Sequence, residues 1–425
     1  MTELSLFVLG ALAGVFAGLV PGIGVFTTLV LLYPLLVELS LSQLLVLYIP
    51  LASISQFIGS VPALYFKIPG EATSFIATEY GHKIFLDGQH DLIPLTAIGS
   101  FLATILSAVV IFLLPYLHES IFYHFLTTKF VFFLIVLTGA CLVATSKNSW
   151  ILSTAMIVVG LTLGNIGFNA STGKFFGTLD NDWLSLGIPL FPFIVSIYVL
   201  PNLINLKPVS IINTDIDCAY RQSIVGIKSH IKTMLNGSLV GMLSGFVPII
   251  GKIVGVSASR AIYKSSDKNS VIAAESSNNS SIFTAMIPLF LFGVPITLGE
   301  ILIFNLAETN YNLVDEFKRI LDTSMLPLVI VLSGIVGLVL SWPMSRYCIM
   351  IFKLPVIVLK CVLLVVVVVS VLYIGYITNM TWYYLFVIMV FLPVGQLLKN
   401  KDPIPLIFAF IFAKISFTII ERILT

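Results

Sequence analysis

The sequence contains very little charge. Asp, Glu, Lys and Arg together make up only 10% of its 425 residues, whereas 58% are hydrophobic. Soluble domains carry about 25% charged residues, so a soluble fold could not hide this much apolar surface. The net charge is only +2 and no basic cluster is present, which argues against a nucleic-acid partner. These absences predict an all-α polytopic membrane protein in contact with the lipid bilayer.

The chain also lacks the patterns of an enzyme or a metalloprotein. Its four cysteines are scattered without a Cys-x-x-Cys pair, and it has no HExxH, no GxSxG and no paired carboxylates in an apolar segment. The histidines have no metal-ligand spacing, and we expect them in surface loops: His82, His90, His118, His124 and His230. We therefore predict a protein that is not an enzyme and has no cofactor.

Long apolar segments fill most of the chain. The N-terminus has no basic region, and its apolar stretch is too long for a signal peptide, so it is predicted to be the first membrane segment. A membrane-spanning helix needs about 20 apolar residues, and by this length criterion the chain has about twelve segments. They lie near residues 5–36, 41–66, 93–115, 130–146, 150–166, 184–206, 235–258, 282–306, 325–342, 355–378, 381–398 and 404–420. Prolines inside 5–36 and 282–306 predict broken or re-entrant segments there.

One pattern of glycine and proline occurs twice. In each half, three glycines recur at every fourth position and are followed by a proline: Gly10, Gly14, Gly18 and Pro21, then Gly237, Gly241, Gly245 and Pro248. Two later prolines repeat as well, since Pro62 and Pro69 are matched by Pro288 and Pro295. We predict two homologous repeats of inverted relation, 1–206 and 235–425, joined by a polar linker at 207–234. Glycines at this spacing also serve close helix packing alone, but paired breaks in both halves point to a transport site.

The first candidate site lies at the break that follows Pro69. Glu71 is an acidic residue beside a helix break in apolar sequence, where charge is costly and usually functional. Lys67 either pairs with it or reaches out to water. Hydroxyls at Thr73 and Ser74, with free backbone N–H groups at a helix start, would suit an anion.

The second candidate site is the polar run AAESSNNSSIF at 273–283, directly before an apolar segment. Its hydroxyls and amides suit both a carboxylate and a dehydrated Na⁺. Asn278 and Asn279 are the candidate ligands for Na⁺ as a coupling ion. The alternative is a group of capping residues at a helix start, where Ser and Asn are favoured.

Taken together, the motifs resemble the large membrane subunit of the tripartite tricarboxylate transporters, the TctA family. Those that carry the resemblance run in family order over nearly the whole chain: GxxxGxxPGIG at 14–24, IPGEATS at 68–74, YGHKIFLDGQ at 80–89, TGKFFG at 172–177, the second glycine series ending at Pro248, AAESSNNSS at 273–281, FGVP at 292–295 and the C-terminal DPIPLIFAFIFAKISFTIIERIL. The resemblance implies a secondary active transporter of a small organic carboxylate, of the tricarboxylate or dicarboxylate class, coupled to Na⁺ or H⁺. It also implies a small membrane subunit and a periplasmic solute-binding protein as partners, and a location in the inner (cytoplasmic) membrane.

Several positions depart from the family pattern. Tyr80 stands where an acidic residue is expected, and Lys252 stands where a small residue is usual. Lys252 falls inside the second predicted break, so it must reach water, pair with a carboxylate or meet a bound anion. Its predicted partners are Glu275 or Glu71 on one hypothesis, and the solute carboxylate on the other.

Breaks and polar clusters together define the candidate solute-binding residues: Gly22, Gly24, Thr27, Pro69, Gly70, Glu71, Thr73, Ser74, Lys252, Asn278, Asn279, Ser280, Pro295 and Thr297. The alternative function is an ion or solute channel, because helix breaks also build selectivity filters. The duplication with two unequal polar clusters favours one asymmetric transport site instead.

Overall fold

The computed structural model of the chain describes residues 2–20, 23–67, 74, 76–117, 128–169, 172–178, 182–206, 219–248, 251–263, 267–292, 294–308, 313–321, 323, 325–352 and 355–424. Its contacts divide the chain into two compact units. Unit 1 comprises Met1–Thr28, Leu39–Phe122 and Pro208–Pro355; unit 2 comprises Leu29–Glu38, Tyr123–Lys207 and Val356–Thr425. Each unit therefore draws on both halves of the sequence.

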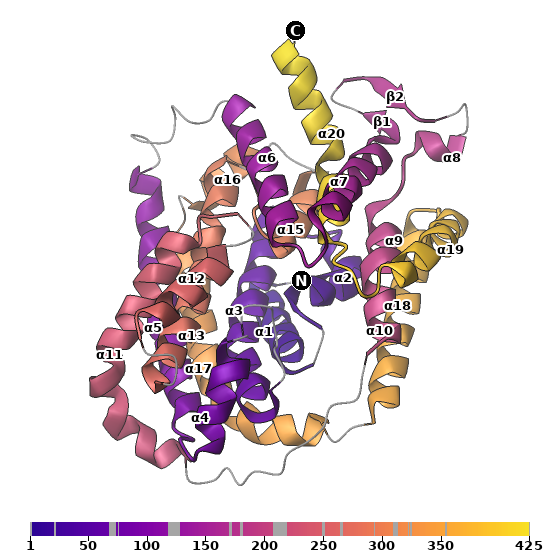
Figure 1. Cartoon of the computed structure of the whole chain (residues 1–425). Helices are drawn as coiled ribbons and strands as arrows, with labels where there is room; N and C mark the ends of the chain where they lie inside the picture. The colour runs from indigo at the N-terminus through magenta and orange to yellow at the C-terminus, as the bar shows by residue number, and fades with distance from the viewer. Residues whose placement is uncertain are drawn as a thin grey trace. The chain divides into compact units, whose positions relative to one another are not determined.

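Unit 1 contains most of the helices that surround the candidate sites. They are α1 (Glu3–Leu19), α3 (Leu41–Phe66), the π-helix η2 (Ala77–Gly81), α4 (His82–Leu86), α5 (Leu92–Leu117), α11 (Ala219–Ser244), α12 (Gly251–Ala261), α13 (Lys268–Ala285), α14 (Ile287–Phe292), α15 (Leu298–Glu308), α16 (Leu313–Leu321) and α17 (Met325–Phe352). Figure 1 shows α5, α11, α12 and α13 grouped together, and α13 packs against the other three.

The two glycine series bring helices into backbone contact. A Cβ built on Gly10, Gly14 or Gly18 of α1 would lie 2.2, 2.9 or 2.7 Å from a carbonyl oxygen of α3. A Cβ on Gly237, Gly241 or Gly245 would lie 2.2, 2.2 or 2.8 Å from a carbonyl oxygen of α13. No side chain fits at these distances, so glycine permits both contacts.

The carbonyls that face the glycines occupy matching places in the two repeats. They belong to Leu47, Leu51 and Ser55 in α3 and to Ala273, Ser277 and Ser281 in α13. These two sets coincide when the repeats are aligned on Pro62 and Pro288. The α1–α3 pair and the α11–α13 pair are thus built with the same register.

Within unit 1, helices from one half of the sequence pack on helices from the other half. Helix α3 packs on α17 from the other half, and α13 packs on α5. Where α3 meets α13, Ser60 contacts Glu275 and Gln56 contacts Asn278, so the two helices run antiparallel at this contact. Equivalent helices in opposite directions are what an inverted repeat requires. The inverted relation itself stays a prediction.

Helix breaks lie at several of the predicted prolines and glycines, although Pro62 lies inside the continuous helix α3. Helix α1 ends at Leu19 and α2 (Val25–Leu36) begins six residues later. In the second half α11 ends at Ser244 and α12 begins at Gly251, while α14 and α15 are separate helices. The later part of the predicted linker, 219–234, is not a loop but the first portion of α11.

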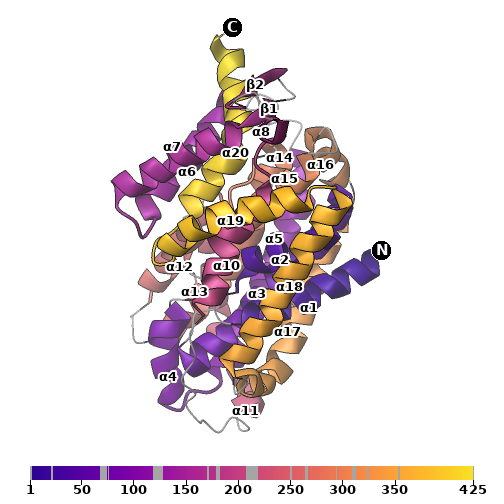
Figure 2. The same ribbon diagram turned by 90° about the vertical axis from the view of Figure 1, so that its right-hand side faces the viewer.

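Unit 2 holds most of α2 and a second group of helices. These are α6 (Thr128–Thr145), α7 (Trp150–Asn165), α8 (Asp182–Ser185), α9 (Leu190–Ile194), the π-helix η4 (Val195–Val199), α10 (Leu200–Ile204), α18 (Val356–Ile377), α19 (Thr381–Leu397) and α20 (Ile404–Leu424). Helix α20 packs on α6 and α7, as the side view shows (Figure 2). Gly164 of α7 approaches the Phe410 carbonyl oxygen, so this contact again depends on glycine.

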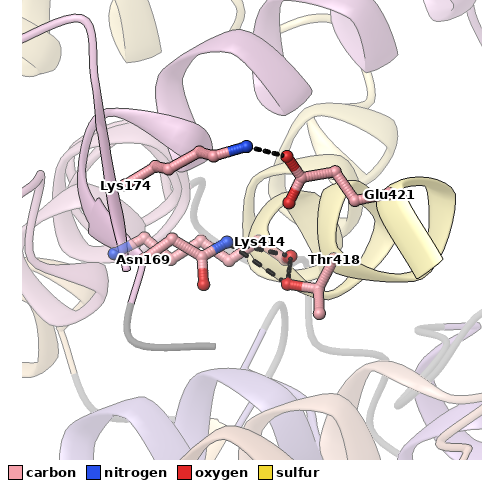
Figure 3. A network of polar contacts seen from close by, with 5 residues as sticks. All are labelled: Asn169, Lys174, Lys414, Thr418 and Glu421. Atoms are coloured by element: carbon pink, nitrogen blue, oxygen red, sulfur yellow. Dashed lines mark hydrogen bonds and ion pairs between the residues drawn. The ribbon is translucent and has the colours of Figure 1, made fainter. Parts of the chain in front are cut away.

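Strands β1 (Gly167–Asn169) and β2 (Lys174–Phe176) form a short antiparallel hairpin. Polar contacts join this hairpin to α20. Figure 3 shows Lys174 paired with Glu421, and the Asn169 amide donating to the Thr418 hydroxyl at 3.3 Å. The Lys414 ammonium donates to the Phe168 carbonyl at 3.0 Å. The hairpin thereby satisfies polar groups that an otherwise apolar helix carries.

Five helices in the described part are long and apolar enough to cross a membrane. They are Leu41–Phe66, Leu92–Tyr116, Met325–Ser345, Val356–Ile377 and Ile404–Glu421. Apart from the β1–β2 hairpin, the described residues fit an all-α membrane protein, and the count of twelve spans stays a prediction. The expectation that all histidines lie in surface loops was wrong for His82, which is buried in α4 and bonds to the Leu64 carbonyl through Nδ1 at 2.8 Å, and for His230, which lies in helix α11. His118 and His124 lie outside the described residues.

Candidate polar site on helix α13

The polar run predicted near a helix start lies in the middle of a buried helix. Helix α13 extends from Lys268 to Ala285, and Asp267 caps it by accepting from the Asn269 backbone N–H. Every polar residue from Glu275 to Ser281 is at most 1% exposed. The capping interpretation was therefore wrong, because these side chains lie beyond the first turn and face other helices.

Three side chains of α13 reach polar groups on two neighbouring helices. Glu275 accepts from the Ser60 hydroxyl of α3. The Asn278 amide donates to Gln56 Oε1 of α3 at 2.6 Å, and the Asn279 amide donates to the Ser100 hydroxyl of α5 at 2.7 Å. These bonds fix the rotamers of the three side chains, and each leaves the other end of its side chain unused.

On α13 the unused atoms are buried oxygen acceptors, while on α3 the amide donor Gln56 Nε2 is also buried and has no partner in the described residues. Glu275 Oε1, Asn278 Oδ1 and Asn279 Oδ1 have no hydrogen-bond partner in the described residues. Glu275, Asn278 and Asn279 stand at positions i, i+3 and i+4, so they are neighbours on one helix face. Buried polar groups are rarely left unpaired, which marks this face as a candidate binding site.

Other polar residues of α13 are satisfied within the helix. Ser280 donates to the Ser277 carbonyl at 3.1 Å and to the Ser276 carbonyl at 3.2 Å. Ser281 donates to the Asn278 carbonyl at 2.8 Å. Their hydroxyls therefore have no need of a ligand, and Ser280 is a weaker candidate than its two asparagine neighbours.

Lys252 is the second residue of α12, directly after the break, and it is half-buried. Gly255, one turn further along, lets α12 approach Ser277 of α13. No carboxylate in the described residues forms an ion pair with Lys252. Glu275, one predicted partner, accepts from the Ser60 hydroxyl instead. Glu71, the other predicted partner, lies outside the described residues.

Glu300 occupies the start of α15. Its Oε2 accepts from the backbone N–H groups of Ile296 and Thr297 at 3.0 and 3.1 Å, and its own N–H points to Thr297 Oγ1 at 3.5 Å. This is a reciprocal capping arrangement at the break that follows Pro295. The N–H groups that a solute anion would use in the second repeat are thus already held by an internal carboxylate.

The first repeat contributes fewer described candidates. Thr27 is buried and its hydroxyl has no partner among the described residues, while Gly24 has open space where a Cβ would be. Ser74 is buried, and its carbonyl accepts from Thr78. The remaining candidates lie outside the described residues: Gly22, Pro69, Gly70, Glu71 and Thr73.

Sequence reasoning missed several polar residues that the fold brings together. Gln56, Ser60 and Ser100 lie in apolar helices and contact α13. Isolated polar residues within otherwise apolar spans were the available signal. Arg260 was also missed; its guanidinium stacks 3.7 Å from the ring centroid of Tyr80, so the tyrosine that replaces an expected acidic residue binds a cation by another means.

Apolar helices of spanning length, paired helix breaks and a buried polar face together define a multi-pass membrane protein of the transport class. The chain belongs to the Tripartite tricarboxylate transporter TctA family, whose model matches residues 4–407. This is a family of transporter components and not of enzymes. The resemblance read from the motifs is thereby confirmed.

One relative extends the comparison. The chain is 26% identical over 302 residues to the "Uncharacterized 52.8 kDa protein in TAR-I ttuC' 3'region" of Agrobacterium vitis. The match covers 67% of this chain and 60% of that relative. No solved structure matches the chain.

Proposed function

We propose that this chain is the permease of a secondary active transporter that moves a small organic carboxylate, of the tricarboxylate or dicarboxylate class, with Na⁺ or H⁺ as the coupling ion. It would work in the inner membrane with a small membrane subunit and a periplasmic solute-binding protein. Membership of the family supports the transporter component, and the remaining details are our proposal.

The observation that carries the proposal is the polar face of α13. A membrane protein keeps a buried, incompletely paired carboxylate only at a cost, and such groups usually mark a substrate or ion pathway. Glu275, Asn278 and Asn279 lie between helices from both repeats, since α3 and α5 come from the first half and α13 from the second. Transporters of repeat architecture place their sites at such a junction.

The solute carboxylate needs positive partners elsewhere. Lys252 makes no ion pair with a described residue and lies on the helix that Gly255 packs against α13. Backbone N–H groups at the break after Pro69 would supply further donors, because the corresponding groups after Pro295 are held by Glu300. We therefore assign the solute to Lys252 and the first-repeat break.

A thermal-stability screen of the purified protein tests the function. Mono-, di- and tricarboxylates are added with NaCl or with choline chloride at equal ionic strength. A ligand that binds the folded state raises the melting temperature by mass action, with about 2.7 kcal/mol expected at 100 times Kd. We expect a rise with a di- or tricarboxylate. No response to any carboxylate, together with no uptake in cells that express the partner proteins, would contradict the proposal.

Lys252→Met tests the solute assignment. Because Lys252 makes no ion pair with a described residue, we expect the variant to fold with a melting temperature within a few degrees of the parent. Loss of a charge-assisted contact is expected to weaken carboxylate binding by about tenfold or more, corresponding to about 1.5–3 kcal/mol. Lys83→Met removes an exposed lysine of α4 and serves as the control. Unchanged carboxylate affinity in Lys252→Met would remove this residue from the site.

A channel is the rival function, and bilayer recordings separate the two. A transporter is expected to give solute-dependent uptake without unitary currents. Single-channel currents that persist without any carboxylate would favour the channel.

A further inference from the structure

We infer that Glu275, Asn278 and Asn279 of α13 form a Na⁺ site, in which the Glu275 carboxylate is the charged ligand and the two asparagine oxygens are neutral ligands. The inference deepens the proposed function and rests on it, because it names the coupling ion and the residue that neutralises its charge.

The hydrogen bonds already present decide which atoms are available. Asn278 and Asn279 each donate through the amide nitrogen, to Gln56 Oε1 and to the Ser100 hydroxyl, so the amide oxygens are the free ends. Glu275 uses Oε2 for the Ser60 hydroxyl and leaves Oε1 free. Three oxygens without a partner among the described residues therefore lie on one helix face, and each side chain is at most 1% exposed.

A cation explains this set better than water does. All three atoms are acceptors, and a single water has only two protons to donate. A Na⁺ ion coordinates several oxygens at once, including amide and carboxylate oxygens.

Charge points to the same conclusion. In the described part of the chain the ion pairs are Lys174–Glu421 and Lys268–Asp91, so neither involves Glu275. A buried carboxylate without a counter-charge is unfavourable, and a bound cation supplies the missing charge.

The donor set selects a monovalent ion. Tight Ca²⁺ sites use several carboxylates, and transition metals prefer His or Cys. Here one carboxylate is joined by neutral oxygens. The described residues hold no group of three or more His, Cys, Asp and Glu that could bind a metal. One negative charge with neutral oxygens matches the charge of Na⁺.

Ion binding at this place would act on the helix packing. The second ends of the three side chains are tied to Ser60 and Gln56 on α3 and to Ser100 on α5. A bound Na⁺ would therefore stabilise the contacts of α13 with both helices, and we expect a higher melting temperature with Na⁺ even without a carboxylate.

The test is a Na⁺ titration of the purified full chain in the absence of carboxylate, with KCl or choline chloride keeping the ionic strength constant. We expect a saturable rise in melting temperature for Na⁺ alone. Glu275→Gln keeps the shape and an acceptor for Ser60 but loses the charge, and we expect apparent Na⁺ affinity to fall by about tenfold or more. Asn279→Ala is expected to weaken Na⁺ similarly, and it remains informative if Glu275→Gln does not fold.

Ser276→Ala is the matched control. Ser276 is as buried as Glu275, but its hydroxyl is already bonded to the Ile272 carbonyl at 2.8 Å. The parent's Na⁺ response should persist in this variant. A parent protein that responds to pH but not to Na⁺, or equal Na⁺ responses in the parent and both site variants, would overturn the inference.

Carboxylate binding and uptake are measured separately from Na⁺ binding. Carboxylate-dependent uptake without Na⁺ binding would overturn the ion site and leave the proposed function intact. Na⁺ binding that depends on Glu275, with no carboxylate bound or moved, would contradict the proposed function and leave the ion site intact.

Discussion

Gly241→Val is expected to prevent the accumulation of folded protein. A Cβ at this position would lie 2.2 Å from the Ser277 carbonyl oxygen and 2.2 Å from Ser280 Oγ. Backbone of α13 cannot move aside without opening its contacts with α3 and α5. An extra methylene in a packed core costs about 1–3 kcal/mol, and two branched methyls against backbone should exceed this. Total stability is only about 5–15 kcal/mol, so most of the protein should fail to fold.

Fluorescence-detected size-exclusion chromatography of a fusion protein measures this result as loss of the monodisperse peak. Gly139→Ala in α6 is the control, because its Cβ would meet Phe408 at an ordinary 3.6 Å and alanine favours the helix. Gly241→Ala should lie between the two. A normal peak from Gly241→Val would show that α11 and α13 do not pack as described.

Glu300→Leu is expected to lower stability strongly, although leucine is apolar and the site is buried. The substitution removes the acceptor for two backbone N–H groups, those of Ile296 and Thr297, at the start of α15. Each buried donor left unpaired costs about 1–3 kcal/mol. We expect a fall of about 3 kcal/mol or more in the free energy of unfolding, measured as a large drop in melting temperature.

Glu300→Gln separates capping from charge. Glutamine keeps an acceptor oxygen for the two N–H groups, so most of the stability should return. Lys252→Met can then be measured in the Glu300→Gln background, where the α15 cap is present but the Glu300 charge is not. If Glu300→Leu melts at the parent temperature, Glu300 is not the cap of α15 and the N–H groups there are open to a solute.

The sequence predicted those features that depend on local chemistry. Glycines at every fourth position predicted close helix contacts, and the prolines predicted where helices break. Both follow from properties of single residues, the missing side chain of glycine and the missing N–H of proline. The fold places Gly10 and Gly237 against matching carbonyls, at the spacing that the repeat pattern implied.

The sequence could not predict which residues from distant parts of the chain contact one another. Lys252 was expected to meet Glu275, Glu71 or the solute carboxylate; among the described residues Glu275 accepts from Ser60 instead, and Glu71 lies outside them. The capping interpretation of the α13 run failed because the helix begins at Lys268, before the serines and asparagines. Helix starts are set by packing as well as by capping residues, so a polar run alone does not locate them.

Composition by itself determined that this chain is a helical membrane protein, because so few charges and so many apolar residues leave no other way to bury the surface. The repeated glycines determined where helices touch, and several of the repeated prolines, but not Pro62, mark where helices break. Only the tertiary structure decided which polar atoms remain unpaired. Among the described residues Glu275 Oε1, Asn278 Oδ1 and Asn279 Oδ1 have no partner, because Ser60, Gln56 and Ser100, far away in the sequence, bond to the other ends of the same side chains. A hydrogen bond has direction and short range, so its partner depends on how helices from different parts of the chain pack together.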